Sequence, residues 1–223
     1  MNIIITGSVA YDYLMTFPGL FRDHILPDRL DSLSLSFLVD SLTRQRGGIA
    51  PNIAYTMALL GGRPKVMATV GEDFAEYRAW LEARGVDTSL ARVIPGKYTA
   101  SFFASTDRAN SQIASFYPGA MTHATELSLA ELPERPDLVV ISPNDPQAMR
   151  QYVRECHDLG LPYLYDPSQQ VVRVDGDTLR EGISGCALLV VNEYELGMIE
   201  KKTGWSEREI LDQAETLIVT RGE

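Results

Sequence analysis

The sequence predicts an α/β domain with a mostly parallel central sheet and a small antiparallel β-sheet inserted into it. Three observations support this fold class. Short apolar runs bounded by turn residues alternate with segments of helical periodicity, as in parallel α/β proteins. Other stretches alternate strictly between apolar and polar residues, which is typical of a sheet with one polar face. The composition, 45% hydrophobic and 22% charged over 223 residues, is that of a folded globular chain.

The strands of the central sheet are expected at short, nearly continuous apolar runs. A parallel strand that is buried on both faces needs such a run, because side chains on both of its faces meet the core. The runs are Ile3–Thr6, Lys65–Val70, Leu138–Ile141, Tyr163–Tyr165, Leu188–Val191 and Leu217–Thr220.

Helices are expected between these strands. Ala50–Leu60 is apolar throughout, which indicates a buried helix. Gln147–Leu159 gathers its apolar residues on one face, and Gly160 follows as a C-terminal stop. Glu207–Thr216 is a second amphipathic helix, for which Ser206 is the expected N-cap.

The inserted sheet is expected to act as a lid over one end of the α/β body. In Ser32–Val39 the leucines and serines alternate, which predicts a strand with one polar face. Lys97–Ser105 and Ser111–Tyr117 form a hairpin around the polar turn Asp107–Asn110. We therefore place the lid strands at about 13–40 and 97–118, within a single domain that spans residues 1–223.

The charge and cysteine content exclude several functional classes. Thirty acidic residues against twenty basic ones give a net charge of -10, which argues against general binding to nucleic acids or anionic membranes. Two isolated cysteines, Cys156 and Cys186, are too few for a disulfide framework. The N-terminus has no basic stretch before its apolar run, and no apolar run is long enough to span a membrane. We expect a cytoplasmic protein.

The segment Gly47-Gly48-Ile49-Ala50-Pro51-Asn52 is the first candidate for a ligand site. Two glycines that open a helix let a ligand approach the backbone closely, and Asn52 adds an amide suited to a polyhydroxylated ligand. Pro51 fits the first turn, where no N–H is needed. The alternative is a tight strand-to-helix connection without a ligand.

Gly7-Ser8, followed by Asp12, lies past the end of the first expected strand. Ligands of open α/β sheets bind at that end, and a carboxylate there can accept hydrogen bonds from two vicinal sugar hydroxyls. The alternative is an aspartate that stabilises a turn or caps a helix.

Phe102 and Phe116 are expected close together on the hairpin, because position 102 pairs with 115 or 116 around the turn. Two rings held in this way could sandwich a planar base. Their alternative role is to pack the lid onto the body.

Asn192 and Glu195 follow another expected strand with the spacing N-x-x-E. An amide and a carboxylate at a strand end can organise hydrated Mg²⁺ and its phosphates. The alternative is a capping box, in which Asn192 caps the next helix and Glu195 completes the box. Asp166-Pro167-Ser168-Gln169-Gln170 adds a carboxylate and two amides to the same rim.

Several chemistries lack their motif. The three histidines have no metal-ligand spacing, and the sequence contains no G-x-G-x-x-G, no P-loop and no G-x-S-x-G. A dinucleotide oxidoreductase, a P-loop kinase and a serine hydrolase therefore have no support.

Taken together, the order and spacing of these residues resemble the PfkB-type, ribokinase-like kinases. Gly47-Gly48-x-x-x-Asn52-x-Ala54 is similar to the N-terminal signature of that family. The resemblance spans essentially the whole chain and is sharpest toward the bacterial adenosine kinases. It is carried by GSVAYDYLMTFPG (7–19), SLSFLVD (34–40), QIASFYPGAM (112–121), DPSQQ (166–170) and KTGWSE (202–207).

The resemblance implies a three-layer α/β/α fold and transfer of the ATP γ-phosphate to the 5′-hydroxyl of adenosine. By similarity, Asp12 and Asn52 hold the ribose with help from Ser8 and the Gly47-Gly48 backbone, and Phe102 and Phe116 clamp the adenine. Gln169 or Gln170 reaches the nucleoside. Asn192, Glu195, Thr220 and Gly222 serve the phosphates, with Mg²⁺ held indirectly by Glu195. The implied cofactors are ATP, Mg²⁺ and a monovalent cation such as K⁺.

The family's second signature, a Gly-Ala-Gly-Asp-like segment that carries the catalytic aspartate, has no match in the chain. We therefore expect the natural protein to continue beyond residue 223, and residues 1–223 to retain much of the nucleoside site without catalysing transfer. The alternatives are a sugar kinase acting on ribose, fructose or a related sugar, and a non-catalytic nucleoside-binding protein. Clasped dimers occur among these kinases, so the polar face of Ser32, Ser34 and Ser36 also predicts a homodimer through the lid.

Overall fold

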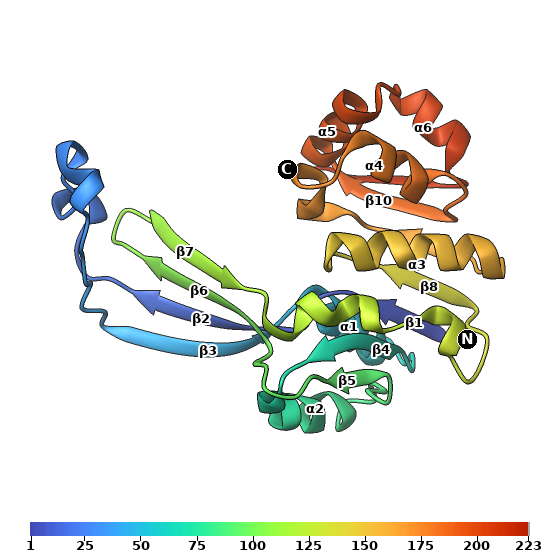
Figure 1. The fold of residues 1–223 in the computed structure, drawn as a ribbon, viewed down its shortest axis with the longest axis horizontal. Helices are drawn as coiled ribbons and strands as arrows, with labels where there is room; N and C mark the ends of the chain where they lie inside the picture. The colour runs from blue at the N-terminus through green and yellow to red at the C-terminus, as the bar shows by residue number, and fades with distance from the viewer. Residues whose placement is uncertain (223) are drawn as a thin grey trace.

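The computed structural model describes residues 1–222 and contains two β-sheets (Figure 1). The larger one is a seven-stranded parallel sheet in the order β11-β10-β9-β8-β1-β4-β5. Every apolar run expected to be a strand of this sheet is one, and only the short edge strand β5 was not predicted. The strands are β1 (Ile3–Thr6), β4 (Lys65–Val70), β5 (Ala91–Val93), β8 (Leu138–Ile141), β9 (Tyr163–Tyr165), β10 (Leu188–Asn192) and β11 (Leu217–Thr220).

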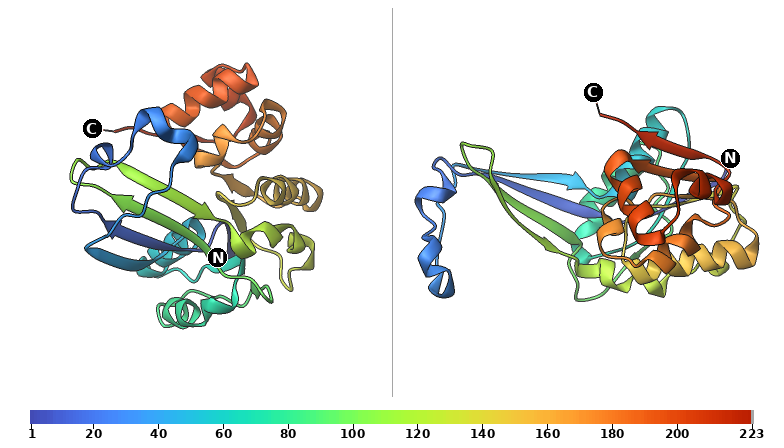
Figure 2. Two further views of the ribbon diagram at one scale, coloured as in Figure 1. Left: turned by 60° about the vertical axis from the view of Figure 1, so that its left-hand side comes forward. Right: turned by 90° about the horizontal axis from the view of Figure 1, so that it is seen from above.

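Helices cover both faces of this sheet, which gives the three layers that the family resemblance implies (Figures 1 and 2). One face packs against α1 (Ile49–Leu59) and α2 (Ala75–Glu82), and the other against α3 (Pro146–Leu159) and α4 (Gly176–Ile183). The helices α5 (Glu193–Thr203) and α6 (Glu207–Gln213) extend that second layer. The short 3₁₀ helices are η1 (Phe21–Asp23), η2 (Pro27–Ser32), η3 (Glu72–Phe74), η4 (Gly119–Glu126), η5 (Leu129–Glu131) and η6 (Ser168–Val172).

Successive residues of each central strand enter different cores, because side chains alternate across a sheet. In β1, Ile4 joins the core beneath α3 and α4, whereas Ile5 joins the core beneath α1 and α2. In β10, Leu189 and Val191 enter the first of these cores. At the opposite face of the neighbouring strand β11, Ile218 is 41% exposed. No helix within residues 1–222 is long and apolar enough to cross a membrane.

The helix boundaries follow the expected caps. Gly160 ends α3 in the left-handed conformation, with φ of 61°. Ser206 caps α6 through a capping box with Glu209. The helix ends at Gln213, three residues before the expected Thr216, because the chain then turns into β11.

The smaller sheet projects from the body as a lid (Figures 1 and 2). Its strands lie in the order β3-β2-β6-β7. The predicted hairpin is present, but the sheet is mixed instead of antiparallel, because β2 and β6 run parallel. The strands also occupy 10–47 and 100–117 instead of 13–40 and 97–118. Their bounds are β2 (Ala10–Thr16), β3 (Ser41–Gly47), β6 (Ala100–Thr106) and β7 (Gln112–Tyr117).

The strand predicted at Ser32–Val39 is wrong. Residues 33–40 form no strand, and Leu33, Leu35 and Leu38 are exposed. Strict alternation makes a strand only where another strand pairs with it, and here the segment crosses the lid tip between η2 and β3. The interior of the tip is instead an aromatic cluster in which Phe37 lies edge-on to Phe17 and Phe21.

Candidate active site between lid and sheet

A cavity of about 350 Å³ lies where the lid meets the carboxyl end of the central sheet. Ser8 follows β1, Pro143 follows β8 and Gln169 follows β9, so three adjacent strands end at this cavity. The lid supplies Phe102 and Phe116. The full lining consists of Ser8, Phe102, Phe116, Met121, Pro143, Gln169, Gln170 and Arg173.

The aromatic pair forms as expected, because Phe102 on β6 lies directly opposite Phe116 on β7. Asp12 on β2 is the neighbour of Phe102 on the other side, so one row across the lid carries a carboxylate and two rings on the same face. That face is turned toward the cavity, since both rings line it. The lid therefore offers an apolar surface with an acceptor beside it.

Asp12 lies within β2 and not in a loop past β1, where the sequence placed it. Burial raises the pKa of its carboxyl group, and no charge or hydrogen bond from residues 1–222 offsets this effect. Gly47 makes room for it: a Cβ at position 47 would lie 2.3 Å from Asp12 Oδ2. The carboxylate is thus held partly buried over a glycine and is available to donors from a ligand.

The second glycine shapes the start of α1. Gly48 has φ of 94°, and a Cβ there would lie 2.5 Å from the carbonyl oxygen of Ser8. The hydroxyl of Ser8 accepts from the Ile49 N–H at 3.3 Å, and its carbonyl accepts from the Ala50 N–H at 3.3 Å. The glycine pair therefore does form a tight connection between strand β3 and helix α1, as the alternative interpretation predicted. Asn52 is exposed one turn further on.

The predicted nucleoside residues thus form two groups. Ser8, Phe102, Phe116, Gln169 and Gln170 line the cavity. The second group, which does not line the cavity, consists of Asp12, Gly47, Gly48 and Asn52. Asp12 connects the two groups, because it is the strand neighbour of Phe102 and its carboxylate lies against Gly47.

Gln170 is 5% exposed and has one unpartnered polar atom. Its Nε2 donates to the carbonyl oxygen of Asn144 at 2.8 Å, and this bond fixes the orientation of the amide. Oε1 then has no partner, and neither has the buried Nδ2 of Asn144. Buried polar atoms without partners are uncommon in folded proteins, so these two mark a place for a ligand or water.

The expected phosphate residues meet at a second point along the same edge of the sheet. Asn192 and Thr220 are register partners at the ends of β10 and β11, and Gly222 follows two residues later. The capping box is present: Asn192 N–H donates to Glu195 Oε2 at 2.8 Å, and Glu195 N–H donates to Asn192 Oδ1 at 2.8 Å. The capping interpretation of N-x-x-E is therefore confirmed as a structural fact.

Asp166, at the end of β9, lies close enough to Glu195 for their charges to interact. Burial, and then the negative charge of Glu195, raise the pKa of Asp166 to about 6. Two carboxylates and an amide oxygen are the donor types that Mg²⁺ prefers. Residues 1–222 contain no group of three or more His, Cys, Asp or Glu side chains that could enclose a metal. Since backbone amides already engage Asn192 Oδ1 and one Glu195 oxygen, the residues fit a hydrated ion held through water.

Sequence reasoning missed Met121, Pro143 and Arg173 among the lining residues. Arg173 follows Gln170 by three residues and therefore lies on the same side of the 3₁₀ helix η6, which the sequence did not predict.

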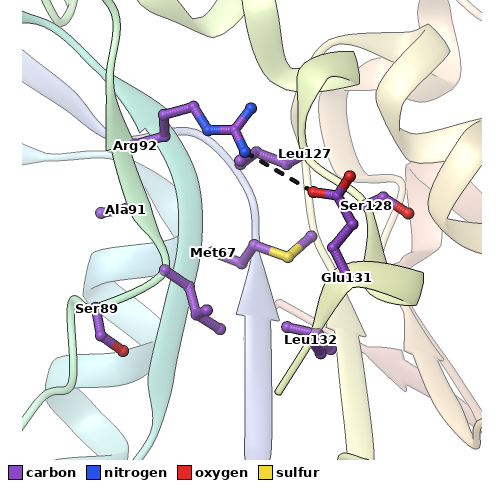
Figure 3. A pocket seen from close by; sticks show the side chains of 9 residues that line it. Met67, Ser89, Ala91, Arg92, Leu127, Ser128, Glu131 and Leu132 are labelled. Carbon is purple, nitrogen blue, oxygen red and sulfur yellow. Dashed lines mark ion pairs between the residues drawn. The ribbon is translucent and has the colours of Figure 1, made fainter. Parts of the chain in front are cut away.

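A second cavity, of about 290 Å³, lies beside β5 and contains none of the predicted residues. Arg92 and Glu131 face each other across it, with Arg92 Nη2 3.9 Å from Glu131 Oε2 (Figure 3). Their side chains are 45% and 71% exposed, so this pair marks a surface groove.

A parallel three-layer body, a β-sheet lid and a cavity between them are typical of α/β proteins that bind small molecules at the carboxyl edge of the sheet. The chain belongs to the pfkB family of carbohydrate kinases, whose model matches residues 8–223.

Among its relatives, a nucleoside kinase of Burkholderia thailandensis, solved in complex with inosine, is 40% identical with a TM-score of 0.84. That match covers 99% of this chain and 70% of the other. A nucleoside kinase of Methanothermobacter thermautotrophicus is 26% identical over 204 residues, which are 90% of this chain and 63% of the relative. The ribokinase of Thermotoga maritima has a TM-score of 0.77 at 16% identity, with 100% of this chain and 72% of that one covered, and shows the fold alone. The chain thus spans between three fifths and three quarters of the length of these relatives.

Proposed function

We propose that this chain provides the nucleoside-binding part of an ATP-dependent nucleoside kinase, which transfers a phosphoryl group to the 5′-hydroxyl. The observation that carries the proposal is the cavity between lid and sheet, with two phenylalanines on one wall and glutamine amides on the other. A nucleobase can stack a planar π face on these rings, whereas a free sugar offers them only C–H groups and has no π face. The inosine complex of the Burkholderia relative supports the same class of ligand.

In this proposal the Asp12 carboxylate accepts hydrogen bonds from the ribose hydroxyls, and the Asn52 amide can donate to them or accept from them. Ser8 lies at the junction of ribose and base. Phe102 and Phe116 contact the base, while Gln169 and Gln170 meet its polar edge. The lid excludes water, so that phosphate passes to the nucleoside and not to solvent.

The nucleotide half of the site is proposed at the other end of the same edge. Asn192, Thr220 and Gly222 would face the ATP phosphates, and Glu195 would hold hydrated Mg²⁺ through water. Magnesium would neutralise charge on the phosphates, and a monovalent cation such as K⁺ stays a prediction of the family resemblance. We assign no catalytic base within the described residues.

Adenosine is the nucleoside that the sequence predicts, and inosine is the one bound in the Burkholderia relative. Gln170, whose Oε1 is an acceptor without a partner, and Arg173, whose guanidinium only donates, both line the cavity. A donor and an acceptor together match the polar edge of both 6-amino and 6-oxo purines, so we expect the site to accept either base.

Calorimetric titration of the 223-residue chain tests the proposal, with adenosine, inosine, ribose and fructose as ligands. We expect a nucleoside to bind and the free sugars to bind far more weakly. Sugar binding without nucleoside binding would replace the proposal with a sugar kinase. Nucleoside binding that never leads to phosphoryl transfer, even in the longest natural form of the protein, would favour a non-catalytic nucleoside-binding protein.

We also propose that the lid is the contact in a homodimer. Leu42, Phe103 and Ile113 lie on the outer face of the lid, opposite Phe102, and each is at least 39% exposed. This apolar face replaces the serine face of residues 32–36 as the expected contact, because those serines do not lie on a strand.

A further inference from the structure

The side chain of Lys202 forms hydrogen bonds with residues 171–174, which belong to the segment that forms one wall of the cavity. Its ammonium group donates to three backbone carbonyl oxygens: Val171 at 2.6 Å, Val172 at 2.9 Å and Val174 at 2.7 Å. An ammonium group has three N–H donors, so all of them are used. Lys202 belongs to the stretch KTGWSE, to which the proposed reaction gives no role.

The three carbonyls lie at the C-terminal end of η6, where a short 3₁₀ helix leaves acceptors without partners. A positive charge is favourable at that end of a helix, both as a hydrogen-bond donor and toward the helix dipole. The same helix carries Gln169 and Gln170, and Arg173 follows it directly. Lys202 therefore binds the backbone of the same short helix whose glutamine side chains line the cavity.

Besides the burial of Val171 and Val174 in the core, a second polar constraint on η6 is the bond from Gln170 Nε2 to the carbonyl oxygen of Asn144. That bond comes from the loop after β8, whereas Lys202 comes from the last turn of α5. Held from these two sides, η6 can hold its glutamines at one position relative to Phe102 and Phe116.

The backbone of α5 at Lys202 is itself held in place by contacts with α4. A Cβ on Gly176, the first residue of α4, would lie 2.1 Å from the carbonyl oxygen of Lys202, so α4 and α5 touch there backbone to backbone. Arg180 of α4 also donates to the carbonyl oxygen of Thr203. The last turn of α5 is thus also held by α4.

The first turn of α5 contains the capping box of Asn192 and Glu195, at the proposed phosphate end of the site. One rigid helix, about 16 Å long at 1.5 Å per residue, therefore connects the two ends of the site. We propose that Lys202 is a positioning residue for nucleoside binding: it acts through η6 to place the polar wall of the cavity. This inference rests on the proposed nucleoside site.

The test compares Lys202→Met with Lys201→Met in the 223-residue chain. Both variants lose one positive charge from neighbouring residues of α5, but Lys201 is exposed and makes no hydrogen bond or ion pair within residues 1–222. Calorimetry with inosine and adenosine should show about tenfold weaker binding for K202M and a change of less than about twofold for K201M.

Two further measurements separate positioning from simple loss of stability. Hydrogen exchange should become faster in residues 168–174 of K202M and remain unchanged in β10 and β11. In a double-mutant cycle with Gln169→Ala, which removes a cavity contact from η6, the two losses of affinity should be less than additive. With Phe102→Ala, on the lid, they should add.

Equal binding by wild type and K202M would overturn the proposal, as would equal losses in K202M and K201M. If K202M does not fold, Lys202→Gln, which keeps one amide donor, takes its place under the same criteria. If wild-type chain binds no nucleoside, the proposed function fails. Unchanged exchange in residues 168–174 would in that case still show that Lys202 does not hold η6.

Discussion

At the scale of single residues, the aromatic pair gives the most direct test of ligand class. Phe102 and Phe103 are neighbours on β6 whose rings lie on opposite faces of the lid. Phe102 lines the cavity, whereas Phe103 stacks on Tyr13 with ring centroids 4.7 Å apart. Phe102→Ala should weaken nucleoside binding by roughly 1–3 kcal/mol, the range for loss of one stacking partner.

Phe103→Ala is the matched control in the same titration, since it removes the same ring from the other face. Its nucleoside affinity should stay within about twofold of wild type, or about 0.4 kcal/mol. Equal losses in the two variants would show that lid stability, and not stacking, accounts for the effect.

The raised pKa of Asp166 predicts how the free energy of unfolding depends on pH. Its pKa is raised from 3.8 to about 6, so between these values the folded protein keeps a proton that the unfolded chain has released. The free energy of unfolding should therefore fall as the pH rises from about 4 to 6, by up to about 3 kcal/mol from this group alone.

Asp166→Asn should remove that slope and raise the free energy of unfolding at about pH 7 relative to wild type. Chemical denaturation at a series of pH values measures both effects. Asp158→Asn, at an exposed position on α3, serves as the control and should leave the slope in place. If Asp166→Asn kept the wild-type slope, Asp166 would be excluded as its source.

The sequence was informative for residues whose environment is set by near neighbours. The pairing of Phe102 with Phe116 follows from counting around one turn, and the capping box of Asn192 and Glu195 follows from their three-residue spacing. Arg173 was missed because its place depends on how η6 packs, which involves Lys202 about thirty residues later. The Asp12 carboxylate was expected in a loop because its strand, AYDYLMT, has no clean alternation.

At the scale of elements, the lid is connected to the body at the corner formed by η3 and α2. Tyr11 of β2 donates through its hydroxyl to the Asp73 carbonyl oxygen at 3.1 Å, and Tyr77 donates to the Gly47 carbonyl oxygen at 3.0 Å.

Ion pairs reinforce this connection. Glu76 of α2 accepts from Arg46 of β3 at 2.5 Å and lies 3.9 Å from Arg44. These contacts join the base of the lid to one helix.

Glu76→Gln should loosen this connection without unfolding the body. The ion pairs are exposed, so the midpoint of thermal unfolding should shift little, by the equivalent of about 0–1 kcal/mol. Hydrogen exchange in β2 and β3 should become faster because the lid samples more orientations. Glu193→Gln removes the distant ion pair with Arg221 and is the control. Unaltered exchange in the lid of the Glu76 variant would show that the two tyrosines suffice.

The central strands were placed correctly because a short run of consecutive apolar residues, such as Leu138–Ile141, is typical of a strand buried on both faces. Helix α3 and the β6–β7 hairpin were also placed correctly, the first from its one-sided apolar periodicity and the second from its polar turn. The lid strands are exposed over much of their length, and β3, SLTRQRG, has no apolar pattern. Strand β3 is extended because its backbone forms hydrogen bonds with β2, and such bonds do not depend on which side chains the strand carries. In Ser32–Val39 the pattern was present and the partner was missing.

At the scale of the whole molecule, the lid face predicts the oligomeric state. Light scattering should give twice the mass of the chain if the outer faces of two lids pair. Leu42→Lys should return the mass to that of a single chain, because it places a charge in the apolar contact. Ser34→Lys, at the lid tip, should leave the dimer intact. A single-chain mass for wild type would refute the lid dimer.

Strand β11 affects how this experiment is interpreted. It is the edge strand of the described sheet, so one side of its backbone has free N–H and C=O groups, and Ile218 beside them is 41% exposed. An apolar edge of this kind is a template for edge-to-edge pairing and for aggregation at high concentration. Pairing of two β11 edges would give a dimer, whereas pairing of β11 with the other edge strand, β5, could continue without a fixed number of chains. Either association would persist in the Leu42 variant. The concentration dependence of scattering from that variant therefore reports how prone this edge is to aggregate, separately from any dimer built by the lid.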